Sequence, residues 1–189
     1  MSSSSTSLDP TPAPRVLANG PAAIAIFVWG VFGVLLLLAQ AIVRLTPLAV
    51  EPVLHRRLTT TQAAIYVGWV VLNAYAESYR GFHRGFSPRV IARAIYLANR
   101  PRPVHVVFAP AFCMSFFHAR RRRMIVAWSV TALIMTFIVL APHLSQPWRG
   151  ILDGGVVVGL AGGILSILYF FVRALRGEPA RVAADLPEA

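Results

Sequence analysis

The chain has 189 residues, of which 57% are hydrophobic and 13% are charged, and its formal net charge is +11. Such a composition is too apolar for an ordinary soluble domain of this length and is typical of a multi-pass membrane protein. All basic residues are arginine, which is typical of GC-rich genomes. Beside hydrophobic spans, this charge predicts contact with anionic lipid and not with nucleic acid. The single Cys113 excludes an intrachain disulfide and a multi-cysteine metal site.

The N-terminal residues 1–20 are rich in serine and proline and predict a disordered tail. A first membrane span is predicted near 22–43, because this run is close to the roughly 20 apolar residues that cross a bilayer as a helix. We expect it to be an uncleaved anchor, because its apolar run is long for a signal peptide. The segment 46–61, with its prolines and charges, predicts a polar connection.

A second span is predicted near 62–79, and it carries the acidic residue Glu77 in its last turn. An ionisable group in a span indicates a functional site by default. Arg80 follows three residues later, so an interfacial ion pair on one helix face is the simpler interpretation. A proton or ligand site at Glu77 is the alternative.

Between the second and third spans lies the basic segment, residues 80–123, which holds ten arginines and no acidic residue. Ser87-Pro88 predicts a helix start, with serine as the N-cap and proline in the first turn. On a helical wheel Arg89, Arg93 and Arg100 fall in one narrow sector, opposite an apolar half. This pattern predicts an amphipathic helix lying in the plane of the lipid head groups.

The apolar run 104–117 is only 14 residues long, contains Pro110 and is too short to cross a bilayer comfortably. A re-entrant or half-buried segment keeps the arginines on both sides of it at one membrane face. A short fifth span, which would reverse the orientation of the N-terminus, is the alternative.

The third and fourth spans are predicted near 124–141 and 151–175. In the fourth span glycine repeats every four residues, and such a face allows another helix to approach closely. The partner is either a second copy of the chain or another helix of the same chain. The repeat consists of Gly155, Gly159 and Gly163. Residues 177–189 predict a mobile C-terminal tail.

Together these elements predict an all-α, polytopic membrane helical bundle over 21–176, with four transmembrane helices, an interfacial amphipathic helix and a short re-entrant segment. Arginine is concentrated in the basic segment and after the fourth span, and basic loops stay on the cytoplasmic side. We therefore expect a bacterial inner membrane protein with both termini cytoplasmic. Arg44, Arg56 and Arg57 lie on the opposite side and mildly violate the rule.

The five histidines do not show a metal or haem pattern. His105 and His118 are thirteen residues apart, like paired haem ligands on one helix, but no matching histidines lie in a second span. Motifs of zinc proteases, serine hydrolases and phosphate loops are missing. No cofactor or metal is predicted.

What remains is a possible phosphate site in the basic segment, because arginine forks match phosphate oxygens and aromatic side chains settle at the interface. Glu77 and His83 are the candidate acid or base residues if the protein is an enzyme. The candidate ligands of anionic lipid are Arg80, Arg84, Arg89, Arg93 and Arg100.

The leading functional hypothesis is a non-enzymatic membrane component, or scaffold, that packs through its glycine face and binds anionic lipid or a partner through its arginines. It would act as a homo-oligomer or as a subunit of a membrane complex. Two alternatives stay open. One is an enzyme acting on a phosphate-bearing lipid at the inner surface, and the other is a small oligomeric proton-coupled transporter that uses Glu77.

Overall fold

The computed structural model describes residues 20–55, 58–178 and 182–187, and these residues form an all-helical fold. Three helices are long and apolar enough to cross a membrane: α1 (Pro21–Leu54), α6 with the short η3 (Arg121–His143), and α7 (Trp148–Leu175). The chain is therefore a multi-pass membrane protein by helix length and composition. Residues 1–19 of the predicted N-terminal tail, and Arg56 and Arg57, lie outside the described residues.

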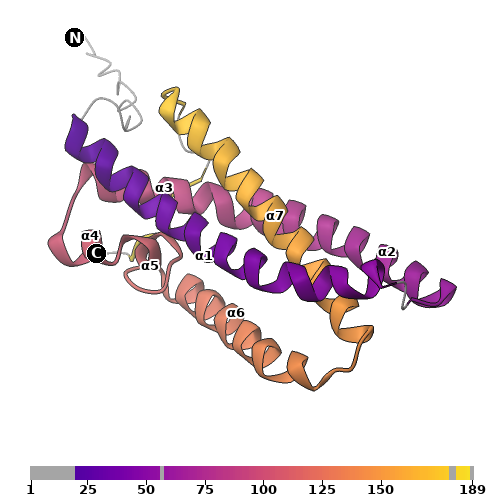
Figure 1. The fold of residues 1–189 in the computed structure, drawn as a ribbon. Helices are drawn as coiled ribbons and strands as arrows, with labels where there is room; N and C mark the ends of the chain where they lie inside the picture. The colour runs from indigo at the N-terminus through magenta and orange to yellow at the C-terminus, as the bar shows by residue number, and fades with distance from the viewer. Residues whose placement is uncertain (1–19, 56–57, 179–181, 188–189) are drawn as a thin grey trace, which may run out of the picture.

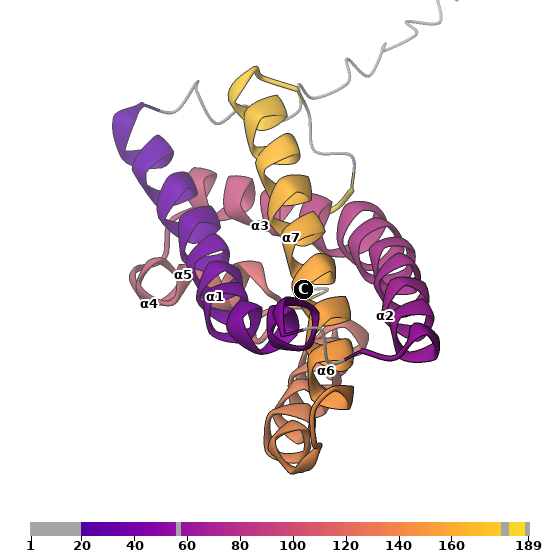
Figure 2. The ribbon, with the colours of Figure 1, turned by 45° about the vertical axis from the view of Figure 1, so that its right-hand side comes forward.

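Three long helical segments form the centre of the fold (Figures 1 and 2). Helix α1 lies against α7, and on the other side of α7 a second segment runs through α2 (Thr60–Asn73) and the π-helical η2 (Ala74–Phe86). Tyr66 lies beside Gly154 and Phe82 beside Gly163, so α2–η2 and α7 run in the same direction. The second predicted span falls on α2 and the first half of η2, and it is not among the three apolar helices.

Helix α1 is longer than its predicted span, because it continues through most of the predicted connection 46–61 and past two prolines. Pro52 has no N–H to give to the carbonyl of Leu48, but Gln146 Nε2 donates to that oxygen at 3.4 Å. The Pro52 ring is buried against Gly150 of α7. Proline is tolerated here because a neighbouring helix supplies the missing contact. Proline as a helix breaker was the wrong interpretation at this position.

The helical backbone continues from Thr60 to Asn99, since η2 leads directly into α3 (Ser87–Asn99). Helix α3 does begin at Ser87 with Pro88 in its first turn, but as a continuation of η2, so the predicted N-cap role of Ser87 is wrong. Ser87 has helical φ and ψ angles, and its hydroxyl is buried without a hydrogen-bond partner in the described chain. Pro88 still affects the helix, because its ring disfavours a regular α-helical turn before it. The wider π-helical turns of η2 end just there.

Helix α3 is buried between α1 and α7 near the start of α1 and the end of α7. Its apolar side packs with residues of both, among them Phe27 and Phe170. Most of its remaining residues are also buried, including Arg93. The prediction of a helix at this position is right, but the prediction that its whole arginine side is exposed is wrong, because Arg93 is buried.

The apolar run 104–117 forms two short helices, α4 (Pro103–Val107) and α5 (Ala109–Cys113), followed by turns. The helix breaks at Phe108, just before Ala109 and Pro110. Helix α5 lies against α1 where Gly30 and Gly33 leave room for Cys113 and Pro110. The run is therefore a broken helical connection packed on the bundle.

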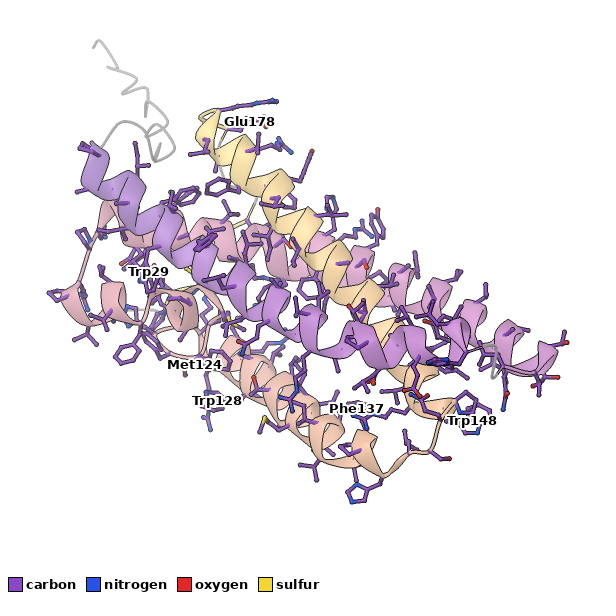
Figure 3. All side chains as sticks on the ribbon, in the orientation of Figure 1. Trp29, Met124, Trp128, Phe137, Trp148 and Glu178 are labelled. Carbon is purple, nitrogen blue, oxygen red and sulfur yellow. The ribbon has the colours of Figure 1, made fainter. Side chains whose placement is uncertain are left out.

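Helix α6 (Arg121–Leu140) stands apart from the other long helices (Figure 1). Only 6% of its most apolar stretch is buried, whereas α1 and α7 bury 28% and 33% of theirs. Figure 3 shows the side chains of Trp128 and Phe137 along this separate helix. Its apolar surface is uncovered by the described chain, so in a membrane it faces lipid or another protein.

Candidate functional site

The arginines of the basic segment are divided between the surface and the interior. Arg80, Arg84 and Arg100 are exposed, Arg89 is half-buried and Arg93 is 0% exposed. Arg84 lies over the ring of Tyr79, with 5.7 Å from its guanidinium carbon to the ring centre. The five predicted lipid ligands therefore do not form one exposed surface.

Arg93 is the centre of a buried hydrogen-bond network. Its Nε donates to the carbonyl of Phe112 at 2.6 Å, and Nη2 donates to the carbonyls of Phe117 and His118, each at 3.1 Å. Its Nη1 donates to the carbonyl of Ala184 at 2.9 Å. A single guanidinium thus joins α3 to the end of α5, to the turns after it and to the C-terminal segment, defined here as residues 182–187.

Arg93 also stacks on the Phe112 ring, with 4.2 Å between the guanidinium carbon and the ring centre. Burial lowers its pKa to about 10, so the side chain remains charged at neutral pH. Its charge is compensated by carbonyl dipoles and not by lipid phosphate. The interpretation of Arg93 as a lipid ligand is therefore corrected: it is a structural cation that fixes the connection between α3 and α6.

The C-terminal segment returns to the basic segment through Asp185. The Asp185 carboxylate accepts a hydrogen bond from Arg123 Nε at 3.0 Å and forms an ion pair with Arg89 Nε at 3.4 Å. The backbone N–H of Arg120 donates to the Asp185 carbonyl at 2.9 Å, and Leu186 packs against the apolar core. The predicted mobile tail is therefore in part an ordered segment. Sequence reasoning missed Asp185 and Arg123, because their pairing spans 62 residues.

His105 and His118 contact each other on the same connection, with 4.8 Å between ring centres and an angle of 42° between the ring planes. Burial lowers the pKa of both imidazoles, and the positive charges of Arg102 and Arg93 lower each further. Both rings also contact the Phe112 ring. They form a cluster of neutral aromatic rings around the Arg93 network. In the described chain no three His, Cys, Asp or Glu side chains group as metal ligands.

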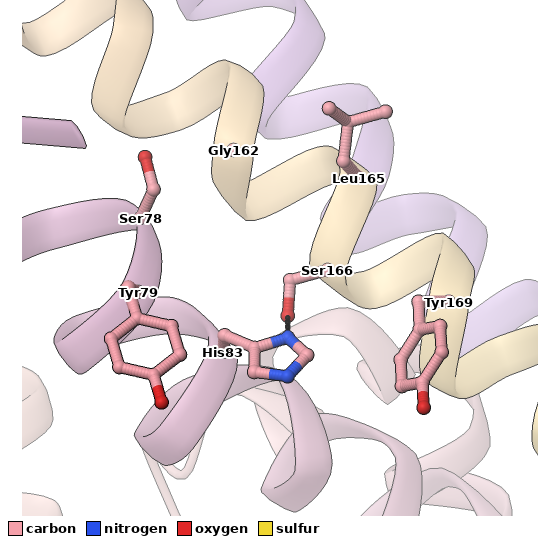
Figure 4. Close-up of a pocket in the computed structure, with 7 residues that line it drawn as sticks. All are labelled: Ser78, Tyr79, His83, Gly162, Leu165, Ser166 and Tyr169. Atoms are coloured by element: carbon pink, nitrogen blue, oxygen red, sulfur yellow. Dashed lines mark hydrogen bonds between the residues drawn. The ribbon is translucent and has the colours of Figure 1, made fainter. Parts of the chain in front are cut away.

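A shallow hollow of about 320 Å³ lies between η2 and α7 (Figure 4). His83 points into it, and its Nδ1 lies 3.1 Å from the Ser166 hydroxyl, which belongs to α7. Tyr79 and Tyr169 stand on either side of the imidazole, with ring centres 6.0 and 5.6 Å from it. The hollow combines a histidine, hydroxyl groups and aromatic walls. Ser166 was not predicted, and in the sequence nothing distinguishes it from a packing serine.

Glu77, the other candidate acid or base, lies about a turn and a half before His83 and is not part of the hollow. Its half-buried carboxylate lies against Gly159 of α7. Glu77 and Arg80 form no ion pair, so the predicted interfacial pair is wrong. Because η2 has π-helical turns, residues three apart are rotated differently than on a regular helix. The structure does not bring the two candidate catalytic residues together.

The glycine face of α7 lies against α2 and η2 of the same chain. Added side-chain carbons would meet Trp69 and Asn73 at Gly155, Glu77 at Gly159 and Phe82 at Gly163. The small residues let polar groups of α2 reach the α7 backbone, as in the bond from Trp69 Nε1 to the Leu152 carbonyl at 3.4 Å. Of the two predicted partners for this face, the fold uses a helix of the same chain.

The comparisons with known proteins do not assign a family. No family model matches the sequence, and neither the curated proteins nor the solved structures include a significant match. A functional assignment therefore depends on the geometry of the arginines, the hollow and the C-terminal segment.

Proposed function

We propose that the chain is a non-enzymatic component of a bacterial inner membrane that binds the phosphate groups of anionic lipids through exposed arginines at one end of its bundle. In this proposal α2 and η2 together make a fourth span, and both termini are cytoplasmic. The connection 104–117 lies at the inner side as a half-buried segment. The protein would act alone or as a subunit of a larger membrane complex.

The observation that carries the proposal is the gathering of arginines at one end. Because α2–η2 runs alongside α7 in the same direction, Arg84 lies toward the end of the bundle where α7 finishes with Arg173 and Arg176; its neighbour His83 contacts Phe170. The contact of Arg89 and Arg123 with Asp185 brings the start of α6 to this end as well. Short loops rich in arginine stay on the cytoplasmic side, which supports this orientation.

The exposed arginines at this end include Arg80, Arg84, Arg100, Arg102, Arg121 and Arg122. None of these six forms an ion pair with another described residue, so their charges are available to an anionic surface. Near such a surface each basic residue contributes on the order of 1 kcal/mol. Several together attach this end firmly without requiring a catalytic site.

Two introduced cysteines test the orientation in a Cys113→Ala background. Arg84→Cys and His55→Cys place thiols at exposed positions, and His55 directly follows the end of α1 that packs on the start of α7. A membrane-impermeant maleimide applied to intact spheroplasts should label position 55, and position 84 only after the membrane is opened. Labelling of position 84 from outside would overturn the orientation and with it the proposed lipid contact.

Lipid binding is tested with the purified protein and vesicles of phosphatidylglycerol or phosphatidylcholine. The triple variant Arg80→Gln, Arg84→Gln, Arg100→Gln should bind phosphatidylglycerol more weakly, by about five-fold for each arginine removed. Arg44→Gln is the matched control, because it removes an exposed arginine of α1 that lies outside the basic segment. Equal losses in both proteins, or no preference of the wild type for phosphatidylglycerol, would refute the proposal.

A second candidate function, an enzyme acting on a phosphate-bearing lipid, is favoured by the hollow. The 3.1 Å contact between His83 and Ser166 is within reach of proton transfer from a hydroxyl nucleophile. Arg84, which lies over Tyr79, is available for a phosphate at the rim. Phospholipid turnover by the wild type that is lost in both Ser166→Ala and His83→Gln would establish this function. Turnover that survives in both variants would exclude it.

A further inference from the structure

The structure brings two guanidinium groups to the same oxygen of a single carboxylate. Arg89 comes from α3 and Arg123 from the first turn of α6, and Asp185 is the anion between them. Arg123 and burial both lower the pKa of Arg89, and burial has the larger effect. The two cations repel each other, so the arrangement needs an anion at the position of the Asp185 carboxylate.

We propose that Arg89 and Arg123 form a binding site for a lipid phosphate, and that Asp185 of the C-terminal segment closes this site by occupying it. This inference rests on the proposed lipid-binding function and adds its regulation. Lipid phosphate and the C-terminal segment compete for the same two arginines. The site is closed when the segment is docked and open when the segment is displaced.

Phosphate is the fitting ligand class because of the donor geometry. Two arginine forks from different helices can bond several oxygens of one tetrahedral group, whereas a carboxylate offers only two oxygens. Nη1 of Arg89 is held by the carbonyl of Gly85 at 2.9 Å, which fixes the direction of that fork. Exposed Arg121 and Arg122 adjoin the site and attract anionic head groups toward it.

Three contacts besides the ion pairs hold the segment in place. They are the bond from the Arg120 N–H to the Asp185 carbonyl, the bond from Arg93 to the Ala184 carbonyl, and the packing of Leu186 on the core. These contacts do not depend on the carboxylate. Replacement of Asp185 by asparagine therefore removes the charge that competes with phosphate while the fixed part of the fold retains its partners.

The experiment compares the binding of wild-type protein and Asp185→Asn to phosphatidylglycerol in nanodiscs, with lipid occupancy counted by native mass spectrometry. We expect Asp185→Asn to bind about three- to ten-fold more tightly, because the carboxylate that it loses takes part in two partly exposed ion pairs. Glu178→Gln is the matched control. It removes the same charge from the C-terminal region, but Glu178 pairs with Arg173 and not with Arg89. Equal gains in both variants would show a bulk charge effect and overturn the inference.

A second measurement needs no variant. In wild-type protein, the amide of Arg120 should exchange with deuterium several times faster in phosphatidylglycerol nanodiscs than in phosphatidylcholine nanodiscs, because displacement of the segment breaks its bond to Asp185. Unchanged exchange would overturn the inference. Inorganic phosphate at matched ionic strength is the third arm. Equal acceleration by inorganic phosphate alone would assign the site to free phosphate and overturn the lipid assignment.

The outcomes separate this inference from the proposed function. If the wild-type protein prefers phosphatidylglycerol and the Asp185→Asn variant binds it no more tightly, the proposed competition by Asp185 is refuted and the lipid-binding function stands. If neither the wild type nor Asp185→Asn prefers phosphatidylglycerol, the lipid-binding function is refuted, and the proposed competition is refuted with it.

Discussion

Replacement of Arg93 by leucine should loosen the connection between α3 and α6 far more than replacement of any exposed arginine. Arg93 donates to four carbonyl oxygens. Within the described chain, only the Phe112 carbonyl of the four accepts a second hydrogen bond, from the Ser115 N–H at 3.0 Å. Three acceptors thus lose the only donor they have within the described chain. At about 1–3 kcal/mol for each unsatisfied buried group, and at the lower end because water reaches part of the network, the cost is about 3 kcal/mol.

The assay uses Cys113, the only cysteine in the chain. Its side chain is 1% exposed and packs from the end of α5 against Gly30 of α1, beside the Arg93 network. Burial also raises the pKa of this thiol to about 12, so it reacts with a maleimide only when the connection opens. A loss of about 3 kcal/mol should therefore accelerate labelling in detergent by about 100-fold.

Two further variants make the result specific. Arg80→Leu removes an exposed arginine and should label at the wild-type rate. Arg93→Lys keeps the charge but loses the planar fork, so its labelling rate should fall between those of the wild type and Arg93→Leu. Labelling of Arg93→Leu within two-fold of the wild-type rate would refute the structural role of Arg93.

Three other predictions test neighbouring parts of the fold. Gly155→Ala should destabilise the protein by about 1–3 kcal/mol in detergent unfolding, because the added carbon would lie 2.6 Å from Trp69 Cδ1. Gly68→Ala, on the exposed side of α2, is the control and should be neutral or stabilising. Equal effects of the two substitutions would contradict the packing of the glycine face on α2. Glu77→Gln should leave stability unchanged or raise it, because no ion pair is lost, and a drop of more than about 1 kcal/mol would show a partner that the fold lacks. Because the pKa values of His105 and His118 are lowered in the folded protein, the unfolded chain binds more protons than the folded protein below pH 6.5. The free energy of unfolding should therefore fall as the pH drops from 7 to 5. Replacement of both histidines by glutamine should reduce this pH dependence.

The long helices were predictable because the bilayer sets a minimum apolar length. The predicted spans near 124–141 and 151–175 correspond closely to α6 and α7. The end of α1 was not predictable, because the side chain that compensates Pro52 comes from Gln146, far along the chain. The same holds for Ser87, whose local capping pattern is overridden by the continuous helix from Thr60 to Asn99.

The arginine side of α3 shows what helical periodicity can and cannot determine. The wheel placed Arg89, Arg93 and Arg100 in one sector, and α3 is indeed a helix. Periodicity shows which residues share a helix face, but not which other parts of the protein contact that face. Three separate pieces of chain present carbonyl oxygens to Arg93, and no local pattern encodes their meeting.

The burial of Arg93 has a consequence for the arginines on either side of it. Because its guanidinium ties α3 to the turns after α5 and to the C-terminal segment, Arg89 on α3 and Arg123 on α6 are held at one anion position. A buried cation that donates four hydrogen bonds to carbonyl oxygens is not available to lipid, but it can position cations that are. The arginines of the basic segment thus separate by burial into one that organises the fold and others whose charges are available to a ligand. Charge counting in the sequence treats them alike, and only the acceptors around each guanidinium distinguish them.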